Sequence, residues 1–482
     1  MTGEGDGDGS VSSEMTPDQF QRIGMEVIER LAEHLRAARA REMPVLDVEE
    51  AKRQAPLWRE PFSMEPCADP ADEMLRMISS VLETSNHLHH PGYIGHQVSV
   101  PLPFASLLEL TNAFLNNGMA VFEMGPLQTV MEIQVVEFLC QQIGYGNESG
   151  GALTHGGSLG NLTALLAMRQ SGQSRWGDSE LSVLVSDSSH YSIDRATRIL
   201  GWGSSGSWKV RADRFGQIDV DRLGPELEAA RTAGRRVIGV VANCCCTVTG
   251  RFDPLRELVE FCRENELWLH VDGAHGASLA FSETHRGLLD GIEHADSVVW
   301  DLHKLAGLPA LNTAVLFKNR QHSLGAFAEE AEYLFHQDPS LDLGHGTLEC
   351  TKRGMGLTAY CAFRVLGTAW FGAHVDRLLE KAARFAEEIE QKADFELACP
   401  PQTNIVCFRY VGDGDTKLGD LDGLQRRIRL DVLASGRYYL VEAQHRGVRW
   451  LRVTLMNPRT EEEDLRGLLE LVREVAKSPR PR

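Results

Sequence analysis

The chain has 482 residues, of which 43% are hydrophobic and 24% are charged, a composition typical of a folded globular protein with about two or three domains. Its formal net charge of −19 argues against nucleic acid or an anionic membrane as a partner, because both bind concentrated Lys and Arg. The longest apolar-rich run, residues 237–248, is too short to span a bilayer.

The N-terminal part predicts a tail followed by a helical segment. Residues 1–13 are mostly Gly, Ser and acids and predict a disordered tail. In the helical segment 14–90, apolar residues recur at helical spacing over 17–40 and 71–85. Residues 43–70 between them are rich in Pro and acids and predict an extended connection.

Four histidines lie within residues 87–96, and histidine is a common metal ligand. A Pro-Gly pair interrupts this run, and no Cys or acidic partner accompanies it. We therefore predict no metal site here.

Short β-branched runs alternate with helical patterns between residues 127 and 317, which predicts an α/β fold with a mostly parallel central sheet covered by helices. We assign this pattern to a large domain at 91–380. The expected strands are 181–186, 208–212, 235–241, 267–272, 297–302 and 313–317. The sequence GWGSSG at 201–206 precedes a strand rather than a helix, so we interpret it as a turn and not as a dinucleotide-binding loop.

The remainder, 381–482, predicts a smaller α+β domain. Strands are expected near 404–410 and 448–456, and helices near 420–435 and 460–477. Thr460 and Glu463 have the spacing of a capping box for the last helix.

A lysine and an aspartate at neighbouring strand ends are the candidate reactive residues. Asp272 ends one expected strand and Lys304 follows another, and ligands of open α/β sheets bind at the carboxyl ends of strands. A lysine amine forms a Schiff base with an aldehyde, and a carboxylate keeps a pyridine nitrogen protonated. The small Gly273 and Ala274 leave room for a flat ring. The pair predicts a site for pyridoxal 5'-phosphate.

Further polar groups fall at the same edge of the sheet. Gly156, Gly157 and Ser158 precede a helical run, so their backbone N–H groups and the helix dipole suit a phosphate. His190 follows the strand 181–186 and can stack on the ring. Three more residues complete the expected cofactor set: Asn161, Asp301 and His303.

Four motifs, GGSLGN, SDSSHYSIDR, ELWLHVDGAHG and SVVWDLHK, resemble group II pyridoxal-phosphate amino-acid decarboxylases over about residues 75–470. The segment VFEMGP at 121–126 is most similar to the glutamate and cysteine-sulfinate branch. The resemblance implies a type I aminotransferase-like fold and a homodimer with active sites at the interface. It also implies an amino-acid substrate.

The resemblance assigns roles to individual residues. It implies that Lys304 binds the cofactor aldehyde, that Asp272 pairs with the pyridine nitrogen, and that Ala274 and His190 lie on opposite ring faces. Ser158 and His303 would hold the phosphate. Arg452 matches the carboxylate-binding arginine, whose planar fork suits that group. The substrate side-chain pocket is expected to include His96, Gln97 and Asn117.

Two departures from the family pattern concern the product and the cofactor contacts. The mobile loop normally carries a tyrosine that protonates the carbanion left by loss of carbon dioxide, and Leu341 best matches its position. Tyr333 lies earlier, and His336 or His345 could supply the proton instead. Cys246 replaces a hydroxyl residue near the ring, within the run Cys244, Cys245, Cys246, which we interpret as packing rather than metal chemistry.

The sequence therefore predicts a dimeric decarboxylase that converts an L-amino acid, with an acidic or small polar side chain favoured, into an amine and carbon dioxide. The missing tyrosine leaves an aldehyde-forming oxidative deaminase as an alternative. A non-catalytic relative that binds the cofactor is a second one. Ten cysteines, several within apolar runs, together with an N-terminus without the bases of a signal peptide, favour the cytoplasm.

Overall fold

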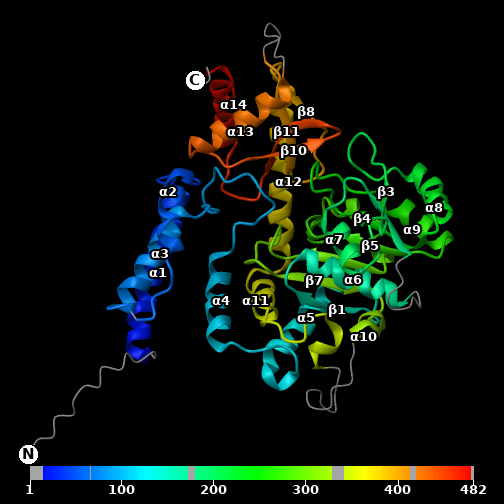
Figure 1. Ribbon diagram of the computed structural model, residues 1–482, viewed down its shortest axis with the longest axis horizontal. Coiled ribbons are helices and arrows are strands. Elements are labelled where there is room, and N and C mark those ends of the chain that lie inside the picture. Colours follow the sequence, from blue (N-terminus) through cyan, green and yellow to red (C-terminus); the bar gives the residue numbers. More distant parts are fainter. Residues whose placement is uncertain (1–14, 66, 172–179, 328–340, 413–419, 479–482) are drawn as a thin grey trace, which may run out of the picture.

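The computed structural model describes residues 15–65, 67–171, 180–327, 341–412 and 420–478. Its centre is a seven-stranded sheet in the order β1-β7-β6-β5-β4-β2-β3 (Figure 1). The strands β3, β2, β4, β5 and β6 are parallel, and β7 runs antiparallel to both of its neighbours, β1 and β6. The bounds are β1 Gly150–Thr154, β2 Leu181–Ser186, β3 Ser207–Val210, β4 Arg236–Asn243, β5 Trp268–Asp272, β6 Ser297–Asp301 and β7 Thr313–Phe317.

Helices cover both faces of this sheet, because its strands are apolar on both sides. Alternate residues of β2 show the arrangement: Val183 and Val185 pack into a core with α6, whereas Leu184 joins the core on the opposite face. The helices of this part are α5 Pro126–Gln142, α6 Gly157–Ser171, α7 Ser192–Ile199, α8 Leu223–Thr232, α9 Leu255–Glu264, α10 Gln321–Phe327 and α11 Gly356–Leu366. The predicted mostly parallel α/β fold is confirmed.

A second, antiparallel sheet of four strands follows in the order β10-β11-β9-β8. Its strands are β8 Phe395–Leu397, β9 Ile405–Tyr410, β10 Val441–His445 and β11 Val448–Thr454, and it packs with α13 Leu421–Ala434 and α14 Glu462–Lys477. The long helix α12, Thr368–Glu390, connects the two sheets. Phe371 near its start lies in the core of the large sheet, and Phe385 near its end lies in the core of the small one.

The N-terminal segment forms α1 Pro17–Ala40, α2 Val48–Gln54 and α3 Pro70–Thr84, which Figure 1 shows together at one flank, away from the central sheet. It is followed by α4, Pro103–Leu115. No helix among the described residues is long and apolar enough to cross a membrane. The tail predicted at 1–13 lies outside the described residues.

Several local predictions were wrong. The connection 43–70 is not extended throughout, because Asp47 caps the short helix α2. Thr460 does not cap α14: its hydroxyl donates to Pro91 O at 2.7 Å, and the capping box is formed by Glu461 and Asp464. The strands β1, β8 and β10 were not predicted. The run GWGSSG is a turn between α7 and β3, as expected.

A buried ion pair fixes the edge strand β1. Lys352 and Glu132, both almost inaccessible to solvent, form a short ion pair. The same two side chains bind the backbone of Leu153: Leu153 N donates to Glu132 Oε1 at 3.0 Å, and Lys352 Nζ donates to Leu153 O. Three segments far apart in sequence therefore depend on this one pair of charges.

Replacing Lys352 by Met should lower the free energy of unfolding by about 3–5 kcal/mol, because it leaves the Glu132 carboxylate buried without its partner. Denaturant unfolding measures the effect. The double variant Glu132→Met/Lys352→Met should lose less than Lys352→Met alone. Lys52→Met, which removes an exposed pair with Glu49, should change stability by less than about 1 kcal/mol. Equal effects of Lys352→Met and Lys52→Met would contradict this account.

Candidate active site

A cavity of about 310 Å³ lies at the carboxyl ends of the parallel strands. The strands β5 and β6 pair in register, so Asp272 at the end of β5 lies beside Val299, two residues before Asp301 at the end of β6. Both strand ends open into the same space. Its lining residues are Gln97, His155, Gly156, Gly157, Ser158, Asn161, His190, Asn243, Cys245, Thr247, Asp272, Ala274, His275, Asp301, His303, Lys304 and Leu311.

Lys304 is held by a buried carboxylate. Its Nζ lies 2.9 Å from Asp301 Oδ2, and Thr313 Oγ1 donates to Asp301 Oδ1 at 2.6 Å. Burial lowers the pKa of the Lys304 amine, but the carboxylates of Asp301 and Asp272 outweigh burial, and this pKa lies above its usual range. Burial raises the pKa of Asp301, yet the charges of Lys304 and His303 outweigh it, and this pKa lies below its usual range.

A chain of hydrogen bonds orients Asp272. Asn161 Nδ2 donates to Asp272 Oδ2 at 2.9 Å, and Asn161 Oδ1 lies 3.0 Å from His270 Nε2. An amide oxygen only accepts, so His270 carries its proton on Nε2, and its Nδ1 accepts from Ser297 Oγ at 2.8 Å. Burial lowers the pKa of His270 to about 4, so its imidazole is neutral at pH 7. The Asp272 carboxylate is thereby oriented through a chain of uncharged side chains.

The start of α6 forms a cradle for an anionic group. Gly156 has a φ of +94°, which favours glycine, and turns the chain from β1 into α6. A Cβ on Gly157 would lie 3.0 Å from Asp301 Oδ1, so only glycine leaves this space open. The first-turn N–H groups of a helix have no partner within it and attract anions. The amine, the buried carboxylate and this cradle fit the aldehyde, the ring nitrogen and the phosphate of pyridoxal phosphate.

Most predicted site residues lie in this cavity. They are Gly156, Gly157, Ser158, Asn161, His190, Asp272, Ala274, Asp301, His303, Lys304 and Gln97. His190 Nδ1 lies 2.8 Å from Ser192 Oγ. Burial lowers the pKa of His190, so its ring is uncharged at pH 7.

Four predicted site residues do not line the cavity: Cys246, Arg452, His96 and Asn117. For Cys246 this differs from its expected role as a cofactor contact. The Cys246 thiol lies 3.7 Å from Ser188 O, and Cys245 and Thr247 face the cavity instead. The period-two alternation of β4 ends at Asn243, so the sequence could not show which cysteine faces inward.

Arg452 is buried on β11, and its Nε and Nη2 have no hydrogen-bond partner in the part of the chain that the structure describes. Burial lowers the pKa of His96, and the Arg452 charge lowers it further, so the guanidinium lies near this histidine. The His96 and Tyr439 rings lie 5.7 Å apart. Asn117 precedes Gly118, which pairs with Arg353.

One residue of the cavity wall, His155, was not predicted, and neither was its partner Glu349 outside the wall. His155 Nδ1 lies 2.5 Å from Glu349 Oε1, and Thr154 Oγ1 donates to Glu349 Oε2 at 2.7 Å. His155 immediately precedes Gly156 within the glycine motif, which was the available signal. Glu349 follows the loop that contains Leu341, so its partner could not be read from the sequence.

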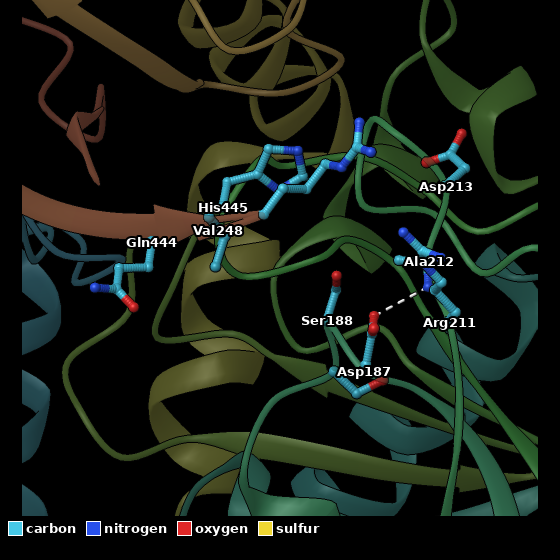
Figure 2. Close-up of a pocket in the computed structure, with 10 residues that line it drawn as sticks. Asp187, Ser188, Arg211, Ala212, Asp213, Val248, Gln444 and His445 are labelled. Atoms are coloured by element: carbon cyan, nitrogen blue, oxygen red, sulfur yellow. Dashed lines mark hydrogen bonds between the residues drawn. The ribbon is translucent and has the colours of Figure 1, made fainter. Parts of the chain in front are cut away.

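A second, larger cavity of about 570 Å³ lies between the ends of β2 and β3 and the β10–β11 turn. Figure 2 shows the residues that line it. It is polar, and Ala212 N donates to Asp187 Oδ1 at 3.0 Å at its edge. Its lining includes no lysine: Asp187, Ser188, Ser189, Arg211, Ala212, Asp213, Val248, Gln444, His445 and Arg446. The smaller cavity is therefore the candidate active site, because it alone of the two contains the amine.

An amine and a carboxylate at adjacent strand ends, with a helix start for a phosphate, define an α/β enzyme that uses pyridoxal phosphate. The chain belongs to the pyridoxal-dependent decarboxylase family, whose conserved domain matches residues 60–411. It is a pyridoxal-phosphate-dependent carboxy-lyase.

Curated relatives cover most of the chain. It is 25% identical to an aromatic-L-amino-acid decarboxylase of Bacillus atrophaeus, over 97% of each chain. It is 29% identical to the human acidic amino acid decarboxylase GADL1, over 86% of this chain and 84% of that protein. It is 30% identical to the cysteine sulfinic acid decarboxylase of Rattus norvegicus, over 73% of this chain and 76% of that protein.

Solved structures share the fold. The crystal structure of mouse CSAD superposes with a TM-score of 0.89 at 24% identity, over 96% of this chain and 99% of that one. The structure of Rhodiola rosea 4-hydroxyphenylacetaldehyde synthase gives a TM-score of 0.85 at 20% identity, over 96% and 99%.

Proposed function

We propose that the chain decarboxylates an L-amino acid with an acidic or small polar side chain to the corresponding amine and carbon dioxide. The observation that carries this proposal is the meeting of Lys304, Asp301 and Asp272 in one cavity. When bound, pyridoxal phosphate supplies an aldehyde and an electron-accepting ring. Lys304 would provide the amine, and Asp272, fixed by Asn161, would keep the ring nitrogen protonated.

The remaining cavity residues would hold and orient the cofactor. The first-turn N–H groups at Gly157 and Ser158, with His303, would bind the phosphate. Ala274 and the uncharged His190 would lie on opposite ring faces. The Asp301 carboxylate pairs with the free Lys304 amine and stabilises its protonated form. Cys245 and Thr247, rather than Cys246, are the candidates for contacts from the loop after β4.

Arg452 is the candidate for binding a substrate carboxylate. Nε and Nη2 form one edge of the guanidinium, and both are buried without a partner among the described residues. This edge matches the two oxygens of a carboxylate. His96 lies beside Arg452, and Gln97 lies in the cavity wall. Relatives named for acidic amino acids, cysteine sulfinate and aspartate support an acidic substrate.

An aldehyde product is the alternative, supported by the absence of tyrosine at Leu341 and by the fold shared with an aldehyde synthase. Tyr333 and His336 lie outside the described residues, and His345 lies in the short helix Leu343–Gly346. A carbanion that is not protonated promptly can react with oxygen, giving aldehyde, ammonia and hydrogen peroxide in addition to carbon dioxide.

We also propose that the chain works as a homodimer. Apolar side chains on α1 and α4 are exposed in the single chain, and the Phe20 and Phe114 rings of these helices lie 5.3 Å apart. Contiguous exposed apolar surface of this kind marks protein interfaces. The exposed residues are Phe20, Met25, Ile28 and Leu31 on α1 and Leu107, Leu110, Phe114 and Leu115 on α4. Asn117, just after α4, would reach the partner's site rather than its own.

The ten cysteines are all unpaired, which supports a reducing compartment, and we infer the cytoplasm. The domain limits 14–90, 91–380 and 381–482 stay predictions.

Replacing Lys304 by Ala or Arg should abolish the visible absorbance band of lysine-bound cofactor and lower turnover by at least about 10³-fold, because neither side chain has a primary amine. Lys304→Arg keeps a cation beside Asp301, so its fold should survive. Lys318→Ala, at an exposed lysine after β7, is the matched control and should keep both signals. An unchanged absorbance band in both Lys304 variants would overturn the site.

Incubating the holoenzyme with acidic, sulfinate, aromatic and diamino acids should release carbon dioxide and amine in equal amounts, most rapidly from an acidic substrate. Aldehyde and hydrogen peroxide in place of amine would establish the alternative product. Arg452→Gln should raise KM for the best substrate about tenfold or more, because a charge-assisted contact is lost. No carbon dioxide from any substrate, with cofactor bound, would indicate a non-catalytic relative.

Light scattering should give a mass of twice 53.4 kDa for the native chain. Phe114→Asp should shift this mass towards the monomer, because it places a charge within the exposed apolar surface. Leu430→Asp, at another exposed apolar position, on α13, should remain dimeric. A native monomer, or a dimer that Phe114→Asp leaves unchanged, would refute the proposed interface.

A further inference from the structure

A third cavity, of about 80 Å³, lies where α1, the segment after α3, α12 and the chain after β11 meet. It is separate from the candidate active site and shares no lining residue with it. The loop after Lys304 contributes Gly307, whose O accepts from Leu102 N at 2.9 Å. The lining residues are Arg39, His89, Val100, Pro101, Leu102, Pro103, Gly307, Trp370, His374, Asn457, Pro458 and Arg459.

The charges that line this cavity are all of one sign. Arg39 and Arg459 both line it, and no carboxylate does. Burial lowers the pKa of Arg39, and the charge of Arg459 lowers it further, so the two guanidinium groups repel each other. Neither forms an ion pair with any described residue. By contrast Arg41, two residues along, binds Asp464 through both carboxylate oxygens at 2.8 and 2.9 Å.

Two buried side-chain nitrogens at this cavity have no hydrogen-bond partner among the described residues: Arg39 Nε is a donor, and His374 Nδ1 is a donor in the tautomer that carries its proton there. Arg39 Nε and His374 Nδ1 are inaccessible to solvent and form no hydrogen bond to any residue in the described ranges. His374 is only 7% exposed, and its ring stacks on Trp370 at 4.9 Å and 6°, which fixes the direction of Nδ1. Leaving a buried polar group unsatisfied destabilises a fold, so a ligand that accepts these hydrogen bonds would stabilise it.

The neighbouring groups also favour an anion. Burial lowers the pKa of His89 to about 4, with the charges of Arg39, His34 and Arg459 contributing, so His89 is neutral and can donate one hydrogen bond. Lys381 contacts two lining residues, because its Nζ donates to Asn457 O at 3.1 Å and Pro458 O at 3.2 Å. No carboxylate among the lining residues therefore compensates the positive charges of Arg39 and Arg459.

We propose that this cavity is a binding site for a small inorganic oxyanion such as phosphate, separate from the cradle at α6. A tetrahedral oxyanion has several acceptor oxygens and can bind Arg39, Arg459 and His374 together, whereas the small volume excludes the cofactor. The bound anion links α1 to α12 and to the chain after β11. It thereby holds the N-terminal segment against the rest of the molecule.

The test titrates the holoenzyme with potassium phosphate, with potassium chloride added to keep ionic strength constant. Saturating the active site with cofactor first removes phosphate binding at α6 from the measurement. Phosphate should raise the melting temperature progressively and bind with measurable heat in calorimetry, and sulfate should act similarly. Chloride alone should have little effect if the site requires an oxyanion.

The double variant Arg39→Gln/Arg459→Gln should weaken phosphate binding by roughly tenfold or more, because charge-assisted hydrogen bonds are lost. Arg36→Gln, at an exposed position on the same helix, is the matched control and should bind phosphate normally. Circular dichroism checks that each variant folds. Undiminished phosphate binding by the double variant would overturn the proposal, as would the absence of any phosphate effect on the native holoenzyme.

Discussion

The parallel pairing of β5 and β6 is the constraint on which the rest of the molecule depends. Each strand ends in a carboxylate at the same edge of the sheet, and Lys304 follows three residues after Asp301. A slip of one residue in this register would turn Asp272 or Asp301 to the opposite face of the sheet. The buried apolar residues of β5 and β6 set this register, and they therefore determine where the two carboxylates lie as well as how the core packs.

The polar groups around this pairing are ordered in layers. Trp268, at the start of β5, donates to Ser297 Oγ at 2.9 Å, and Ser297 in turn holds His270. The network continues through Asn161 to Asp272, so residues that touch no ligand decide how the carboxylate points. A buried network of this kind is favourable when each polar group in it has a hydrogen-bond partner. The geometry of the cavity therefore depends on the packing at the start of β5 and β6.

Much of this could be predicted, for reasons that differ between residues. Strands with continuous apolar runs, such as β2 and β6, are evident from composition, whereas β1 begins with Gly150 and Gly151 and carries little strand signal. Lys304 and Asp272 follow from their positions at strand ends. The facing of Cys245 rather than Cys246, the pairing of His155 with Glu349, and the contact of Thr460 with Pro91 depend on loop paths and distant neighbours, which local patterns do not encode.

The ion pair between Lys304 and Asp301 has a consequence for how the apoprotein acquires its cofactor. An ammonium group has no lone pair for an aldehyde, and the two nearby carboxylates keep this amine protonated at neutral pH. Before Lys304 can attack the aldehyde, its ammonium group must therefore transfer a proton to a neighbouring group, and Asp301 is within reach. The fraction of this amine that is free to attack grows as the pH rises, so the same carboxylate that stabilises the empty protein also slows cofactor binding at neutral pH.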